Sequence, residues 1–163
     1  MFFKQNCDTE IVIKDYFTIV NGKTPKKDRQ DYHQNGTIKF LSQKGLLDIY
    51  YLNEQVLPTK LITEKAVKEE KMPFSHQNSV MMTHMAQDEN FRRRIVWCQT
   101  NNYTFNNLVA NFIAKDKEHH NYYSAGLFFA LRNRANDLAN EILGSRGEGG
   151  KVNVGLIKNF SVP

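Results

Sequence analysis

Residues 20–25 read Val-Asn-Gly-Lys-Thr-Pro, and residues 31–40 read Asp-Tyr-His-Gln-Asn-Gly-Thr-Ile-Lys-Phe. Each stretch contains an Asn-Gly pair, which is a strong turn signal. The segment between the two pairs is polar and basic. After the second pair, residues 37–41 alternate polar and apolar side chains, as a half-buried strand does. The region therefore predicts an exposed basic loop that is held between two turns and followed by a strand.

Apolar patterning outside this region predicts further strands and helices. Residues 10–20 fit either a strand or a short helix. We predict a short helix over 63–71 and a long one over 122–143, where apolar residues recur at helical spacing and Gly144 follows. Strands are predicted at 79–83, 94–98, 107–113 and 152–154, with an extended apolar segment at 156–163. This mixture indicates an α/β or α+β fold with more short strands than helices.

Length and composition are those of one ordinary globular domain. The chain has 163 residues and 40% of them are hydrophobic, so it can build a core. Its 22 basic and 17 acidic side chains give a net charge of +5, which permits nucleic-acid binding without requiring it. No apolar run approaches the roughly 20 residues of a membrane-spanning helix. The two cysteines, Cys7 and Cys98, are too few for a disulfide framework and suit a reducing cytosol.

Sequence motifs for catalysis are weak. The glycines of residues 144–151 are not followed by the Gly-Lys-Ser/Thr of a phosphate-binding loop, and no dinucleotide fingerprint joins a strand to a helix. His76, His84 and Cys98 match no standard zinc spacing. We therefore predict a protein that is not an enzyme, with no catalytic and no metal-binding residues.

Basic and amide side chains recur in the predicted loops, where a rigid scaffold presents residues to a partner. Lys and Arg neutralise phosphates, and Arg, Lys, Asn and Gln pair with base edges in the major groove. The alternative for each group is a solvated surface loop, although three adjacent guanidiniums at 92–94 repel one another and favour an anionic neighbour. The candidate DNA-binding residues are Lys23, Lys26, Lys27, Arg29, Gln43, Lys44, Gln77, Asn78, Arg92, Arg93, Asn101, Asn102, Arg146 and Lys151.

The order of motifs resembles a known family. Residues 20–25 and 31–40 resemble the opening of a target recognition domain from the specificity subunit of type I restriction-modification systems. That family has a Gly-x-Thr-Pro turn and then a Tyr-Trp-x-x-Gly-x-Ile-x-Trp stretch. Here His33 and Phe40 stand where the two tryptophans are commonest.

The resemblance extends along nearly the whole chain. Residues 61–67 resemble the family's Ile-Thr segment with its small helix, and residues 105–113 resemble its Asn-containing strand. A helix, a Gly-Gly-Lys loop and a closing segment at 157–163 follow in the family's order. The family's spacer helix is missing after Pro163. We therefore expect a single target recognition domain over residues 1–163, as a half-length protein or a domain cut from a longer one.

The resemblance implies a twisted, partly barrel-like sheet with a few flanking helices. It also implies a non-catalytic, cytoplasmic, bacterial or archaeal DNA reader that binds one half of a bipartite target in double-stranded DNA. The parent system is type I or a fused restriction-modification enzyme. The domain itself would hold no cofactor, and S-adenosylmethionine, ATP and Mg would be used by partner methyltransferase and restriction subunits.

Residue chemistry divides the candidates into two contact classes. We predict that Lys26, Lys27, Arg29, Arg92 and Arg93 contact phosphates, whereas base edges are read by Gln43, Lys44, Gln77, Asn78, Asn101 and Asn102. Tyr32 and Phe40 are predicted to pack in the core, and Thr24-Pro25 to shape the first loop. Two other functions stay open, namely a protein- or glycan-binding interaction module and a small metal-dependent nuclease.

Overall fold

The centre of the fold is a four-stranded sheet with the order β2-β8-β5-β6. It consists of β2 (Phe17–Asn21), β8 (Val109–Ala114), β5 (Ser79–Thr83) and β6 (Ile95–Cys98), and all neighbours are antiparallel. The structure is a computed structural model that describes residues 10–52, 60–83, 91–144 and 154–162. All five residues of β5 are buried, so this strand is covered on both faces.

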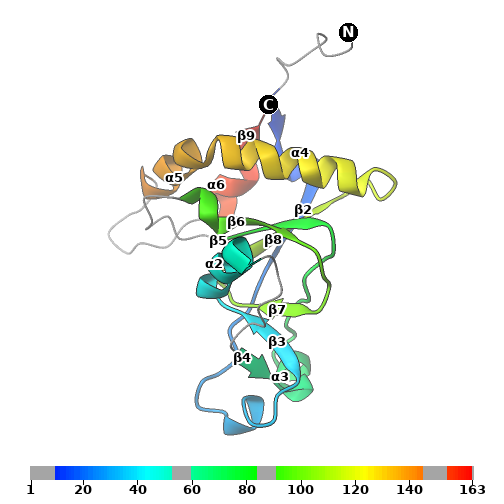
Figure 1. The fold of residues 1–163 in the computed structure, drawn as a ribbon, viewed down its shortest axis with the longest axis vertical. Coiled ribbons are helices and arrows are strands. Elements are labelled where there is room, and N and C mark those ends of the chain that lie inside the picture. The colour runs from blue at the N-terminus through cyan, green and yellow to red at the C-terminus, as the bar shows by residue number, and fades with distance from the viewer. Residues whose placement is uncertain (1–9, 53–59, 84–90, 145–153, 163) are drawn as a thin grey trace.

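Helices cover one face of this sheet (Figure 1). α4 (His120–Asn133), α5 (Ala135–Gly144) and α6 (Val154–Asn159) form most of this layer. The short α1 (Ile13–Tyr16) joins them, and β1 (Ile11–Val12) pairs with β9 (Ser161–Val162) beside it. Apolar side chains of the sheet and these helices form the largest core, including Phe17, Phe112, Leu131, Leu138 and Ile157.

The opposite face of the sheet packs against α2 (Gln43–Leu52) and a three-stranded sheet with the order β4-β3-β7. The strands are β4 (Lys60–Ile62), β3 (Ile38–Leu41) and β7 (Tyr103–Phe105). β3 runs antiparallel to β4 and parallel to β7. A second core lies between the sheets and includes Leu41, Leu46, Met81 and Phe105.

A third, smaller core lies at the lower end of the molecule in Figure 1 and forms the distal lobe (residues 23–40 and 60–72). Tyr32 from the 3-10 helix η1 (Gln30–Tyr32) packs there with Phe40 of β3 and with Ile62. Ala66 of α3 (Glu64–Glu69) completes the contact. Thr63 caps α3 by accepting the Ala66 N–H at its hydroxyl, 3.3 Å away.

The first Asn-Gly pair lies where β2 ends, and the chain that follows it is held against the turn between β7 and β8. The Gly22 N–H donates to the Val109 carbonyl at 3.0 Å, and the Lys23 N–H donates to the Phe105 carbonyl at 2.9 Å. The Thr24 hydroxyl donates to Asn107 Oδ1 at 2.8 Å. Two sequence motifs that lie far apart in the chain therefore form one structural unit, and Thr24 shapes the loop as predicted.

Most of the fold predictions are confirmed. The class is mixed α/β, and the predicted strands at 37–41, 79–83 and 107–113 correspond to β3, β5 and β8, with the predicted short helix at α3. The segment 10–20 contains both a short helix and a strand. Tyr32, Phe40 and Cys98 are buried, as predicted. The described strands form three sheets without a closed barrel. None of the helices in the described residues has the length and apolar character that crossing a bilayer requires.

Three predictions of secondary structure near the C-terminal end of the sequence were wrong. The helix over 122–143 is two helices, because the chain turns at Arg134, whose guanidinium binds the Ser161 carbonyl at 2.7 Å and lies over the Phe160 ring. The extended segment at 156–163 is α6 followed by the two-residue β9. The strand predicted at 152–154 is also wrong at Val154, which begins α6, and its first two residues lie outside the described residues.

Candidate nucleic-acid interface

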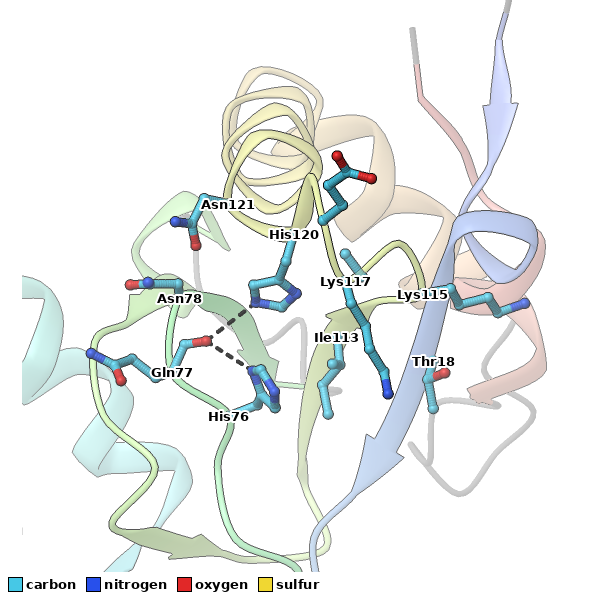
Figure 2. A pocket seen from close by; sticks show the side chains of 11 residues that line it. Thr18, His76, Gln77, Asn78, Ile113, Lys115, Lys117, His120 and Asn121 are labelled. Carbon is cyan, nitrogen blue, oxygen red and sulfur yellow. Dashed lines mark hydrogen bonds between the residues drawn. The ribbon is translucent and has the colours of Figure 1, made fainter.

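Gln77 and Asn78 lie in a tight turn that leads into β5. Asn78 has a φ of 55°, a left-handed backbone conformation that asparagine tolerates better than most residues. The Gln77 carbonyl oxygen is approached by two histidine rings, with His76 Nδ1 at 2.8 Å and His120 Nε2 at 3.2 Å. The centroids of these rings are 4.7 Å apart, and Figure 2 shows them on either side of that carbonyl. The backbone of the turn thus lies beside two imidazoles, while the Gln77 side chain extends away from them in Figure 2.

The turn borders a groove of about 700 Å³, here called the histidine groove. β2, the end of β8 and the start of α4 form its other walls (Figure 2). Besides the turn residues it is lined by Thr18, Ile113, Ala114, Lys115, Lys117, Glu118, His120 and Asn121. Its lining therefore combines cationic, amide and apolar surface, a combination that suits a nucleic-acid strand.

A buried asparagine fixes the turn from below. Asn111 in β8 is fully buried, and its Oδ1 accepts the His76 N–H at 2.9 Å. Its Nδ2 donates to Ser79 Oγ at 2.6 Å and to the Val80 carbonyl at 3.0 Å. The Ser79 hydroxyl in turn donates to the His76 carbonyl. Both donors and the acceptor of the amide are satisfied, so this network rigidifies residues 76–80.

The second amide pair, Asn101 and Asn102, lies on the exposed segment between β6 and β7 at the same end of the sheet. Ser75 joins the two segments, since its hydroxyl donates to the Thr100 carbonyl at 2.8 Å and its N–H donates to the Tyr103 carbonyl. Four of the predicted base-reading residues are therefore carried by two directly bonded segments.

The basic loop of residues 23–29 belongs to the distal lobe. Lys26 and Lys27 are exposed, and Lys27 lines a second groove of about 690 Å³ with His33 and Lys60. Lys23 donates from Nζ to the Glu70 carbonyl at 3.1 Å. Lys26 and Lys27, for which phosphate contacts are predicted, are therefore accessible to a partner.

Arg29 is engaged within the protein. Its guanidinium bonds both carboxylate oxygens of Asp31 at 2.8 Å, reaches Glu69 at 3.2 Å and lies 4.4 Å above the Tyr32 ring. Lys65 also contacts Asp31 at 2.8 Å, and the Tyr32 hydroxyl donates to Glu69 at 2.7 Å. These five residues, here called the ionic cluster, join the basic loop to α3. The geometry favours a structural role for Arg29, and its phosphate contact stays a prediction.

The ionic cluster changes the acidity of its members. Hydrogen bonds from Arg29 and then Lys65 hold the pKa of Asp31 well below its ordinary value of 3.8. The Tyr32 hydroxyl and the two cations lower the pKa of Glu69, and the bond to Glu69 raises the pKa of Tyr32 to about 12. A lowered carboxyl pKa stabilises the fold at pH values above the unfolded pKa, and the contribution is lost as pH falls through the folded value.

We expect the acid sensitivity of the fold to depend on these two carboxylates. The free energy of unfolding should be steady near neutral pH and decline as pH falls below about 4.5, the ordinary glutamate value. The double variant Asp31→Asn/Glu69→Gln should show a shallower acid decline in urea titrations at a series of pH values. Glu64→Gln, on the exposed start of α3, is the control. An acid decline of unchanged steepness in the double variant would exclude this assignment.

Gln43 and Lys44 were predicted to lie in a loop. The structure instead places them in the first turn of α2. Arg92 and Arg93 are likewise in a helix, the 3-10 turn η2 (Phe91–Arg94), so the predicted strand starts only at Ile95. Both corrections have a local cause, because Leu46 and Phe91 are buried core residues that hold these turns. Arg92 is exposed, at the opposite end of the β5–β6 pair from Gln77. Arg146 and Lys151 lie outside the described residues.

Several groove residues were not predicted from the sequence, namely Thr18, Lys115, Lys117, His120 and Asn121. A signal was present, because residues 115–120 join a predicted strand to a predicted helix and contain two lysines and two histidines. By contrast, no local sequence signal shows that β2 pairs with β8, the pairing that brings Thr18 beside Ile113. Within the described part of the chain, no three His, Cys, Asp or Glu side chains are grouped so as to hold a metal ion.

The fold is similar to part of the solved specificity subunits of type I restriction-modification systems, which confirms the resemblance at the level of structure. The chain matches the type I restriction-modification system S subunit from M. genitalium with a TM-score of 0.57 and 10% identity, covering 98% of this chain and 36% of that one. It matches the HsdS subunit from Thermoanaerobacter tengcongensis with a TM-score of 0.57 and 11% identity, covering 100% of this chain and 35% of that one.

The chain spans about a third of the length of these two solved S subunits. No family model matches its sequence, and no curated protein matches it either. The likeness is therefore one of fold, at 10–11% sequence identity.

Proposed function

We propose that the chain is a sequence-specific DNA-binding domain that reads one half of a bipartite target for a restriction-modification complex. The observation that carries the proposal is the match of its whole length to S subunits of type I systems. In this proposal the domain is not an enzyme. Partner subunits with S-adenosylmethionine, ATP and Mg perform methylation and cleavage in the cytoplasm of a bacterium or archaeon.

The chemistry of the loops supports this proposal. Gln77 and Asn78 project from a turn that the buried Asn111 network holds rigid, as base recognition requires. Asn and Gln side chains pair with adenine through two hydrogen bonds in the major groove, whereas lysines and arginines bind phosphates of any sequence. The exposed cations Lys26, Lys27 and Arg92 suit the second task.

The proposal treats residues 1–163 as one recognition domain. Because the chain covers about a third of each solved S subunit, we propose that it supplies one half of the DNA interface. Binding to an isolated half-site should therefore be weak, of micromolar order or poorer, near the non-specific range.

Selection of duplexes from a random library by the 163-residue chain tests the proposal. We expect enrichment of a short motif. Gln77→Ala should relax the preference at one base pair, whereas Arg92→Ala should weaken binding to every duplex and reduce the salt slope by about 1. Asn140→Ala, an exposed amide on α5, is the matched control. Absence of any enriched motif under low-salt conditions would refute the proposal.

A further inference from the structure

The lining of the histidine groove has an excess of positively charged side chains. Lys117 and Lys115 line it together with one acidic residue, Glu118. Figure 2 shows Lys117 extending along the groove toward Ile113 and Thr18, whereas Lys115 extends away from the histidines. Lys115 donates to the Lys14 carbonyl at 2.8 Å. Lys117 is therefore the ammonium that the fold directs into the groove.

The two histidines have a fixed orientation. A carbonyl oxygen only accepts hydrogen bonds, so both rings donate an N–H to Gln77, His76 from Nδ1 and His120 from Nε2. The remaining nitrogen of each ring is an acceptor when the ring is neutral and a donor when it is protonated.

We propose that the histidine groove holds a phosphodiester group of the DNA strand whose bases face Gln77 and Asn78, with Lys117 as its charged contact and the His76 and His120 rings beside it. This inference rests on the proposed function. Inorganic phosphate offers the same oxyanion, but a groove of about 700 Å³ has the size of sites for much larger ligands. The amides of Gln77, Asn78 and Asn121 in the same lining suit bases and sugars adjoining the phosphate.

The single variants Lys117→Gln and His120→Gln test the groove. Each should weaken binding to the selected duplex and to a random duplex by a similar, several-fold factor, and Lys117→Gln should reduce the salt slope by about 1. Lys158→Gln, which removes an exposed lysine from α6, should leave the slope unchanged. Thermal melting of each variant checks that it is folded.

A second measurement distinguishes the two sources of phosphate. Imidazole NMR signals of His76 and His120 should move on addition of the selected duplex and remain in place with millimolar inorganic phosphate. Movement with inorganic phosphate that also displaces the duplex would assign the groove to a small anion and overturn the inference.

Failure of the inference is separable from failure of the proposed function. If Lys117→Gln binds with the wild-type salt slope while Gln77→Ala still relaxes sequence preference, the domain reads DNA and the groove is not its phosphate site. If the wild-type chain selects no motif, the proposed function itself is wrong.

Discussion

Gly22→Ala should lower the free energy of unfolding by about 3 kcal/mol or more, which places it in the severe tail of single substitutions. A Cβ atom at this position would lie 2.2 Å from the carbonyl oxygens of both Phe105 and Asn106. These are backbone atoms in the turn between β7 and β8, so the clash cannot be relieved by rotating a side chain. The first loop must move away, and the bonds from Gly22 to Val109 and from Lys23 to Phe105 are then lost.

Urea unfolding of the variant measures this effect, and Gly126→Ala is the matched control. A Cβ at Gly126, in the middle of α4, meets no atom within 4 Å. Alanine there should raise stability by about 0.5–1 kcal/mol, because glycine is a poor helix former. If Gly22→Ala raised the free energy of unfolding as Gly126→Ala does, the contact of residue 22 with residues 105–106 would not be the reason for glycine at this position.

The Gly22 contact shows what local sequence signals reveal. The Asn21-Gly22 pair predicted a turn, but Asn21 is the last residue of β2 and Gly22 begins the loop that follows the strand. The physical requirement for glycine is the contact with residues 105–106, which no local pattern encodes. Gly36 is similar, because a Cβ there would lie 2.7 Å from the backbone of Ile62. Each motif was thus recognisable singly, whereas its partner segment appears only in the folded chain.

The missed elements have a similar origin. The pattern of apolar residues over 122–143 continues without interruption through Arg134, where the contacts with Ser161 and Phe160 come from a segment more than 25 residues further along the chain. β7 is only three residues long, and it is a strand because it pairs in parallel with β3. Non-local pairing of this kind overrides local propensity in short strands.

The candidate site was predictable in part for the same reason. Gln77 and Asn78 were identified because amides cluster in one predicted loop, and the structure places them in a turn where Gln77 is exposed and Asn78 half-buried. The histidine groove around them is assembled from β2, β8 and the start of α4, so its composition depends on strand order. Sequence patterns identified the side chains that project from loops, and the structure was needed to find their neighbours.

Asn111→Leu should cause the second large effect, a loss of about 3 kcal/mol in the free energy of unfolding. Leucine is similar in size and fits a buried strand, but it removes the acceptor of the His76 N–H and the amide donor to the Ser79 hydroxyl and the Val80 carbonyl. Each buried polar group that loses its hydrogen bond costs about 1–3 kcal/mol. Urea unfolding measures the loss, and exposed Asn140→Ala should stay within about 0.5 kcal/mol of the wild type.

The same variant should reduce sequence discrimination at temperatures where it is still folded. Asn111 is not among the residues that line the histidine groove. Its effect passes through the backbone of His76, and releasing that backbone frees the turn that carries Gln77 and Asn78. The preference at the base pair read by Gln77 should therefore relax, while the salt slope, set by cations elsewhere, should stay at its wild-type value. Ser79→Ala removes only part of the network and should relax the preference less. An Asn111→Leu protein that is destabilised but selects the wild-type motif with full discrimination would show that the rigidity of this turn is not the source of specificity.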